Sequence, residues 1–415
     1  MTRWLFWMSA AIIAYTYLGY PLWLYLRSRF APQPWAQAPI TPRISIIMPV
    51  HNGEALLQKK IEHLLTLDYP QDGAEIIIVS DGSDDGTNDI LRRTTHPAVQ
   101  VLILDAPRGK AGALNEGMKL ARNEIALFVD IRPWLERDAV RQLISNFADP
   151  RVGCAAGELS LRQEGHDQTT SAIGGLYWRY EQALRHYGAR VDSTTSVYGG
   201  FYAVRRELLT PFPEGLILDD MYQPLRVVYQ GYRAVSDPKA RVIDTWPKQT
   251  RGEFHRKVRT LAGNFQLLQL APWVLSGKNR LRLQLVSHKL LRLIVPALLP
   301  ALMVSSWALS SASFFLACFV AQAAFYALAL LGFINVPGLR RLAGPANALV
   351  VLNAAVILGL FKFLFHRGPL WKIWTERKPQ DGTIAEGATA VGRWTTPVPA
   401  EAGEGNRTDG AVADK

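Results

Sequence analysis

Four long apolar stretches constrain this chain more than any other feature of its sequence. They cover residues 5–26, 293–308, 314–336 and 346–361. Each approaches the roughly 20 residues that an α-helix needs to cross a bilayer. Because only helices and closed barrels satisfy every backbone group inside lipid, we expect four membrane-spanning helices beside a large globular region.

The first stretch allows two interpretations. The sequence "WAQA" before Pro39 resembles the small-residue site at which a signal peptide is cleaved. The apolar run is too long for the core of a signal peptide, however, and Arg27 and Arg29 follow it. We therefore expect residues 1–30 to be a retained transmembrane helix and residues 285–366 to hold three more.

The distribution of basic residues bears on partners and on orientation. The net charge is +11 and the isoelectric point is about 9.6, yet the basic residues form no tail and no basic helix with stacking aromatics. Nucleic acid is therefore not an expected partner. The basic residues flank the apolar stretches instead: Arg27, Arg29, Lys278, Arg280, Arg282, Lys289 and Arg292. The positive-inside tendency predicts a multi-pass protein of the plasma (inner) membrane whose central region faces the cytoplasm.

The C-terminal end gives weaker signals. Residues 376–415 are rich in Gly, Ala, Thr and Pro and show no apolar periodicity, which predicts a disordered tail. Lys372, Arg377 and Lys378 favour the cytoplasm, whereas four spans from an outside N-terminus place the tail outside, so its side stays open. Two cysteines, at 154 and 318, provide neither a disulfide framework nor a metal site.

Residues 40–250 read as a globular α/β domain. Short β-branched runs alternate there with stretches of helical spacing: "RISIIMPV", "EIIIVSD", "VQVLILD" and "EIALFVD". This alternation predicts βαβ units and a mainly parallel, Rossmann-like sheet. Ligands of such sheets bind at the carboxyl ends of the strands, where this chain repeatedly places acidic residues. A single such aspartate commonly caps a helix or makes a turn, but the repetition indicates a site.

The region 251–284 follows this domain and precedes the second apolar stretch. Apolar residues recur at helical spacing from Phe254 to Leu268, with basic residues between them. This pattern predicts an amphipathic helix that lies along the membrane surface.

Four motifs in the central region occur in a fixed order. They read "ISIIMPVHNGE", "IIIVSDGSDDGT", "RGKAGALNEGM" and "ALFVDIR". Over residues 43–268 the chain resembles the family 2 glycosyltransferases, and with its apolar flanks it resembles their membrane branch of cellulose, hyaluronan and poly-N-acetylglucosamine synthases. The resemblance implies a GT-A fold, a nucleotide-diphosphate sugar such as a UDP-sugar as donor, a divalent cation (Mg²⁺ or Mn²⁺), and inverting transfer to a hydroxyl group.

Several residues of these motifs are candidates for holding the donor. Asp81 ends a strand in a Gly-rich turn and suits the uracil or the ribose, and Glu54 and Pro49 lie at the end of the preceding strand. Lys110 begins a helix and suits the diphosphate. The alternative, purely structural interpretations are a turn with an N-cap for "DGSDDGT" and a solvated surface lysine for Lys110.

The acid pair Asp219 and Asp220 resembles the family element whose second member acts as the base. Inverting transfer needs a carboxylate that takes the proton of the attacking hydroxyl, so the resemblance implies Asp220 as the catalytic base. Asp219 would raise the pKa of Asp220 by like-charge repulsion. We also expect an acceptor-binding surface formed by Asp219 together with Tyr198, Gly199 and Gly200.

Two motifs depart from the family pattern. The Asp-x-Asp metal motif reads Asp130-Ile131-Arg132. Because magnesium is commonly held by one or two carboxylates with water and phosphate oxygens, we expect Asp130 alone to hold the cation in a weakened site. We expect Arg132 to pair either with phosphate or with Asp130 itself.

The second departure concerns the Gln-x-x-Arg-Trp motif, which reads "RKVRT" from Arg256. Arg256 and Arg259 would stabilise the departing diphosphate. Thr260 replaces a tryptophan that stacks on the acceptor sugar in polymer-making relatives, which puts long-chain synthesis in doubt.

Three functions therefore stay open at the level of sequence. The first is sugar transfer to a glycan in polysaccharide or cell-envelope synthesis, with an accessory export protein as a possible partner. The second is transfer of one sugar to a polyprenyl phosphate or another lipid. The third is a subunit that binds nucleotide sugar without turnover, but Asp81, Lys110, Asp130 and Asp220 favour an enzyme.

Overall fold

The structure is a computed structural model. It describes residues 1–162, 168–245, 250–333, 340–366, 368 and 370. The predicted disordered tail, residues 376–415, lies outside the described residues.

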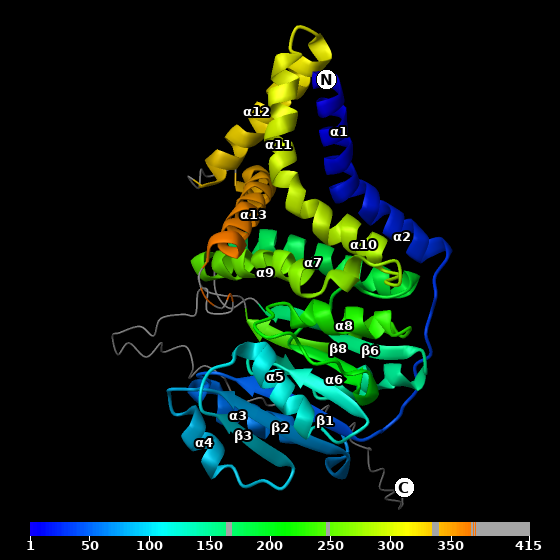
Figure 1. Cartoon of the computed structure of the whole chain (residues 1–415), viewed down its shortest axis with the longest axis vertical. Helices are drawn as coiled ribbons and strands as arrows, with labels where there is room; N and C mark the ends of the chain where they lie inside the picture. Colours follow the sequence, from blue (N-terminus) through cyan, green and yellow to red (C-terminus); the bar gives the residue numbers. More distant parts are fainter. Residues whose placement is uncertain (163–167, 246–249, 334–339, 367, 369, 371–415) are drawn as a thin grey trace, which may run out of the picture. The chain divides into compact units, whose positions relative to one another are not determined.

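A single mixed sheet forms the centre of the globular region (Figure 1). Within the described residues eight strands follow the order β3-β2-β1-β4-β7-β6-β8-β5. Their bounds are Ile44–Val50 (β1), Ala74–Asp81 (β2), Val99–Leu104 (β3), Ile125–Val129 (β4), Trp134–Leu135 (β5), Val152–Arg162 (β6), Phe201–Arg205 (β7) and Arg233–Thr245 (β8).

The pairing of the strands fixes where ligands can bind. Strands β3, β2, β1 and β4 are parallel, β7 is antiparallel to both β4 and β6, and β6 is parallel to β8. The mainly parallel sheet expected from the alternating runs is thus confirmed. The carboxyl ends of β1, β2, β3 and β4 meet at one edge of the sheet, and this edge carries the predicted site.

Helices cover both faces of the sheet. Their bounds are Glu54–Leu65 (α3), Thr87–Arg93 (α4), Gly109–Leu120 (α5), Ala139–Ser145 (α6), Gln168–Val191 (α7) and Asp219–Tyr229 (α8). The β-branched side chains of each inner strand alternate between the two faces, so Ile46 joins one buried core and Ile47 joins the other. Helix α5 lies close to β1 at Gly117, where an added Cβ would come within 2.5 Å of the Ile47 side chain.

Four helical segments of the described chain are long and apolar enough to cross a membrane, as expected. They are Thr2–Phe30, Arg282–Ala308, Ser313–Gly332 and Ala343–Phe365. The first contains α1 (Thr2–Ala14) and α2 (Tyr20–Phe30), and the others centre on α11 (Leu291–Ala308), α12 (Ser313–Phe333) and α13 (Arg340–Phe365). Helix α1 contacts α11, and α12 contacts α13 (Figure 1).

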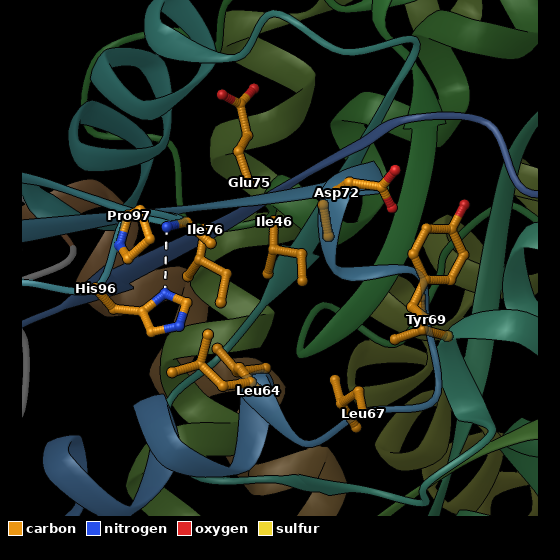
Figure 2. Close-up of a pocket in the computed structure, with 13 residues that line it drawn as sticks. Ile46, Leu64, Leu67, Tyr69, Asp72, Glu75, Ile76, His96 and Pro97 are labelled. Carbon is orange, nitrogen blue, oxygen red and sulfur yellow. Dashed lines mark hydrogen bonds between the residues drawn. The ribbon is translucent and has the colours of Figure 1, made fainter.

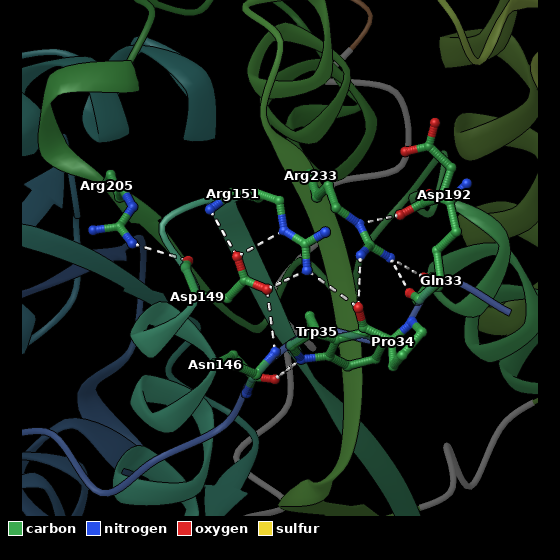
Figure 3. A network of polar contacts seen from close by, with 11 residues as sticks. Gln33, Pro34, Trp35, Asn146, Asp149, Arg151, Asp192, Arg205 and Arg233 are labelled. Atoms are coloured by element: carbon green, nitrogen blue, oxygen red, sulfur yellow. Dashed lines mark hydrogen bonds and ion pairs between the residues drawn. The ribbon is translucent and has the colours of Figure 1, made fainter.

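A polar network ties the connection between α2 and β1 to the sheet (Figure 3). The Arg233 guanidinium donates to the carbonyl oxygens of Gln33 and Ala189 at 2.8 Å each, and to that of Asp192 at 2.8 Å. Asp149 accepts a hydrogen bond from the Ala36 N–H at 3.1 Å. These bonds fix the residues that follow the first membrane helix.

The predicted amphipathic helix is present as α9, Thr250–Leu270. It packs against α13, because an added Cβ at Gly359 would lie 3.0 Å from the backbone nitrogen of Ala262. The rings of Phe265 and Phe363 stack at the same interface, with centroids 6.0 Å apart. The helix therefore joins the globular region to a candidate membrane-spanning helix, and its place at a bilayer surface stays a prediction.

Candidate active site

The loop after β2 is joined to the loop after β3. Asp81 is only 5% exposed, and its carboxylate accepts a hydrogen bond from the Arg108 N–H at 2.6 Å. Gly82 has a φ of +58°, and an added Cβ there would lie 2.4 Å from the backbone nitrogen of Pro107. Only glycine allows the loops after β2 and β3 to approach this closely. Asp81 thus joins two loops that border the predicted nucleotide site.

Glu54 fixes the same loop from the side of β1. Its carboxylate accepts a hydrogen bond from the Gly86 N–H at 3.0 Å, and its own N–H donates to Asp85 at 3.2 Å. Pro49 lies in β1, paired in register with Val79 of β2. Asp81, Glu54 and Pro49 are thus neighbours in space, as expected, but both carboxylates already have partners in the protein.

Three charged side chains meet where β4 ends and α8 begins. The Lys110 amine lies 3.0 Å from an oxygen of Asp130 and 3.2 Å from an oxygen of Asp219. It also lies 3.4 Å from the carbonyl oxygen of Gly199. We call Lys110, Asp130 and Asp219 the charged centre. Burial opposes the charge of Lys110, but the two carboxylates outweigh it and raise the pKa of Lys110, so this lysine is protonated.

Asp220 lies beside the charged centre at the start of α8. Burial, reinforced by the negative charge of Asp219, raises the pKa of Asp220 to about 6. The backbone leaves little room here, since an added Cβ at Gly199 would lie 3.0 Å from the Cβ of Asp220. A carboxylate with this pKa is ionised at neutral pH and is a stronger base than an ordinary aspartate.

Three arginines were expected near the charged centre, and one of them differs from expectation. Arg132 pairs with Asp244 of β8 at 3.2 Å, and Asp130 pairs with Lys110. Of the two expected partners of Arg132, phosphate and Asp130, the pairing with Asp130 is therefore wrong. Arg132 forms its ion pair with Asp244 of β8, and Asp130 forms its ion pair with Lys110.

The other two arginines lie on α9. Burial and the charge of Arg256 lower the pKa of Arg259, while Asp219 and Asp130 oppose this shift. Arg259 is therefore within electrostatic range of the charged centre. Its Nε atom is buried and has no hydrogen-bond partner among the described residues. A buried guanidinium in this state favours an anionic ligand.

The donor set for a divalent cation is small. In the part of the chain that the structure describes, no group of three His, Cys, Asp or Glu side chains could hold a metal ion. Asp130 and Asp219 lie close together, but both share their charge with Lys110. These residues fit a cation only if diphosphate oxygens and water complete its coordination shell, which is common for magnesium.

The predicted acceptor residues lie next to the charged centre. The Asp130 N–H donates to the carbonyl oxygen of Gly200 at 3.2 Å. Tyr198 packs edge-to-face against Trp178, with ring centroids 6.3 Å apart. Burial and the charge of Asp130 raise the pKa of Tyr198. Tyr198, Gly199, Gly200 and Asp219 are therefore one cluster.

Sequence reasoning missed two residues of this site. Lys60 on α3 is fully buried and donates to the carbonyl oxygen of Pro133. Its occurrence on the apolar spacing of α3, between Leu57 and Leu64, is a signal that could have revealed it. Asp244, the partner of Arg132, is far away in the sequence, and no local pattern marks it.

A cavity of about 500 Å³ lies at the opposite end of the strands (Figure 2). Its lining includes Ala74 and Glu75, which begin β2, and residues 96–98, which precede β3. Leucine and isoleucine side chains form much of the remaining wall. Because ligands of parallel sheets bind at the carboxyl ends, this cavity is separate from the site described above.

The sequence matches a known family over the region that carries these loops. Residues 45–210 match the model of glycosyl transferase family 2. This segment is a family 2 glycosyltransferase domain. Its limits include the whole of β1 apart from the first residue, and they end just after β7.

Curated relatives and a solved structure agree with this assignment. The chain is 24% identical over 232 residues to the protein named "Probable glycosyltransferase YdaM" of Bacillus subtilis, which covers 54% of this chain and 55% of the relative. It is 25% identical over 254 residues to poly-beta-1,6-N-acetyl-D-glucosamine synthase of Staphylococcus epidermidis, covering 59% and 60%. The chain thus spans little more than half the length of these relatives.

The solved structure is the mannosyltransferase PcManGT from Pyrobaculum calidifontis in complex with GDP-Man and Mn²⁺. The TM-score is 0.66 at 25% identity, and the similarity covers 88% of this chain and all of that one. The GT-A fold expected from the motifs is thereby confirmed, and the expected family 2 match holds for residues 45–210.

Proposed function

We propose that this protein is a membrane-anchored, inverting glycosyltransferase that moves a sugar from a nucleoside-diphosphate sugar to a hydroxyl group in polysaccharide or cell-envelope synthesis. The charged centre beside Asp220 is the observation that carries this proposal. It combines a protonated lysine with a carboxylate of raised pKa at the carboxyl edge of the sheet. The resemblance to poly-N-acetylglucosamine synthases supports a glycan product.

The donor would lie across the carboxyl ends of β1, β2 and β4. The loops fixed by Asp81 and Glu54 would enclose the nucleoside, and Lys110 with Arg256 and Arg259 would face the diphosphate. Cationic side chains in such a site stabilise the negative charge that develops on the leaving group. A bound Mg²⁺ or Mn²⁺ would add Lewis-acid charge there, and Asp130 is the residue that would hold it. Arg132 lies on the same segment and adds positive charge.

Asp220 would act as the base. The acceptor hydroxyl oxygen attacks the anomeric carbon, the bond from that carbon to the diphosphate oxygen breaks, and Asp220 takes the hydroxyl proton. Tyr198, Gly199 and Gly200 lie beside the charged centre and would orient the acceptor, together with Asp219. The nucleotide is a UDP or a GDP: the motifs favour the first, and the neighbour with GDP-Man suggests the second.

Orientation follows from the basic residues that flank the spans. Arg27 and Arg29 end the first span, and Lys278 and Arg280 precede the second. The positive-inside tendency would place the catalytic domain in the cytoplasm of a cell with this protein in its inner membrane. An accessory export protein would then be needed if the glycan is secreted.

A second candidate function is transfer of a single sugar to a lipid acceptor. It is favoured by the contact between α9 and the membrane helix α13, which brings the charged centre and a span together through Arg259 and Gly359. The third candidate, a subunit without turnover, is disfavoured because Asp220, the candidate base, is present next to Lys110, Asp130 and Asp219.

Membranes that contain the full chain, incubated with radiolabelled UDP- and GDP-sugars with and without Mn²⁺, test these candidates together. Label in high-molecular-mass glycan supports the first function, and label that extracts into organic solvent supports the second. Label that binds without entering either product supports the third. Absence of label from all fractions with every donor contradicts the proposed activity.

A further inference from the structure

A lysine is buried behind the segment that carries Asp130. Lys60 belongs to α3, has no exposed surface, and donates to the carbonyl oxygen of Pro133. Its amine lies 5.7 Å from the ring centroid of Trp134. Pro133 and Trp134 belong to the stretch that runs from Asp130 through Arg132 into β5, so α3 packs against this stretch through Lys60.

The charges around Lys60 come from two strands. Burial lowers the pKa of Lys60 to about 7, and the carboxylates of Asp130 and Asp244 oppose this shift. His63, one turn further along α3, contributes no charge: burial, helped by Lys60, lowers its pKa to about 4, and its ring nitrogen accepts the Leu135 N–H at 3.1 Å. Lys60 is therefore a buried basic group behind the carboxylates at the ends of β4 and β8, only partly protonated at neutral pH, and an anion bound nearby would favour its charged form.

We expect a lysine in this position to contribute little to the stability of the fold. Burying an ammonium group costs free energy unless a direct ion pair compensates for it. Lys60 donates its hydrogen bond to a neutral carbonyl oxygen, and burial lowers the pKa of Lys60 although the two carboxylates oppose this shift. A methionine of similar length would avoid this cost. Buried ionisable residues with perturbed pKa values cluster at functional sites.

We propose that Lys60 is a positioning residue of the donor site, which holds the Asp130–Trp134 segment from behind and supplies positive charge toward the donor diphosphate. The inference rests on the proposed function. Arg132 stands where the family pattern has a second metal-binding acid, so cationic groups already dominate this segment. Lys60 is a further basic group next to this segment, and because it is buried, solvent screens its charge little.

Lys60→Met and its neighbour Lys59→Met form a matched pair, because Lys59 lies on the same helix and is exposed. Binding of UDP and of GDP to the purified full chain is measured by calorimetry with Mn²⁺, and the melting temperature is measured on the same samples. We expect Lys60→Met to melt no lower than the wild type and to bind the nucleoside diphosphate about tenfold more weakly, as for one unit charge several ångströms away. Lys59→Met should change neither quantity.

The opposite pattern, a lower melting temperature with unchanged affinity, would show that Lys60 is merely structural and would overturn the proposal. If Lys60→Met loses both stability and affinity, Lys60→Arg decides. This variant keeps the charge and should recover most of the affinity, and failure to recover it contradicts the proposal. If the wild type binds neither UDP nor GDP, the proposed function fails with it, whereas equal affinity of wild type and Lys60→Met refutes the role of Lys60 alone.

Discussion

The two sides of the active-site edge satisfy their carboxylates in different ways. On the nucleotide side, Asp81 and Glu54 accept hydrogen bonds from the backbone N–H groups of Arg108 and Gly86. On the transfer side, Asp130 and Asp219 face the Lys110 amine at 3.0 and 3.2 Å. Backbone partners make a fixed shape that suits recognition, whereas mobile cations can exchange carboxylate for phosphate. Changes on the transfer side should therefore affect the reaction more than changes on the nucleotide side.

The largest effect is expected for Asp220→Asn. Removing the base should lower the turnover rate by about a thousandfold, within the range of general-base contributions, and leave nucleoside-diphosphate binding unchanged. Turnover is measured as radiolabel transferred under saturating donor. Asp89→Asn, an exposed acid on α4, is the control and should be active. An active Asp220→Asn would exclude this residue as the base.

Lys110→Met should have the next largest effect. Without the ammonium group, Asp130 and the buried Asp219 repel the diphosphate, and we expect kcat/KM to fall about a hundredfold. Lys119→Met lies on the same helix but in an exposed pair with Glu116, so it should behave as wild type. Steady-state kinetics with varied donor make the comparison. Similar kinetics for the two variants would show that the charged centre does not bind the donor.

The effect of pH should be about tenfold. Asp220 acts as a base only when it is ionised, and its pKa is about 6, so the rate should be constant above neutrality and fall tenfold per pH unit well below 6. Rates are measured at saturating donor from pH 5 to 8. The residual activity of Asp220→Asn should lack this limb. A rate that stays constant down to pH 5, as for an ordinary aspartate, would contradict the effect of burial described above.

The smallest effect is expected on the nucleotide side. Asp81→Asn keeps one acceptor for the Arg108 N–H, so the loop should hold its shape while donor KM rises about fivefold and kcat stays constant. Asp72→Asn, at the other end of the same strand, serves as the control. A loss of kcat in Asp81→Asn as large as that in Lys110→Met would remove the distinction between the two sides.

The same contrast explains how much the sequence could predict. The nucleotide side is local: β-branched runs predict β1 and β2, and the Gly-rich turn after Asp81 predicts its loop. The helix start at Lys110 and the acid pair at the start of α8 were also placed by local motifs. Their roles in catalysis stay predictions.

The transfer side depends on contacts between distant segments, which no local pattern contains. The partner of Arg132 is Asp244, and Lys60 reaches the carbonyl oxygen of Pro133 from another helix. The helical periodicity of α3 predicts that Lys60 lies on the buried face, but it does not predict what the amine contacts. The close packing of α9 on Gly359 is equally non-local.

Calorimetry on the purified wild-type chain tests the central claim most directly, namely that this edge of the sheet binds a nucleoside diphosphate. UDP and GDP are titrated separately in the presence of Mn²⁺. The account predicts saturable heat at one site per chain for at least one of them, weakened in Lys110→Met and unchanged in Lys119→Met. No heat from either nucleotide, or equal affinity in both lysine variants, would contradict it.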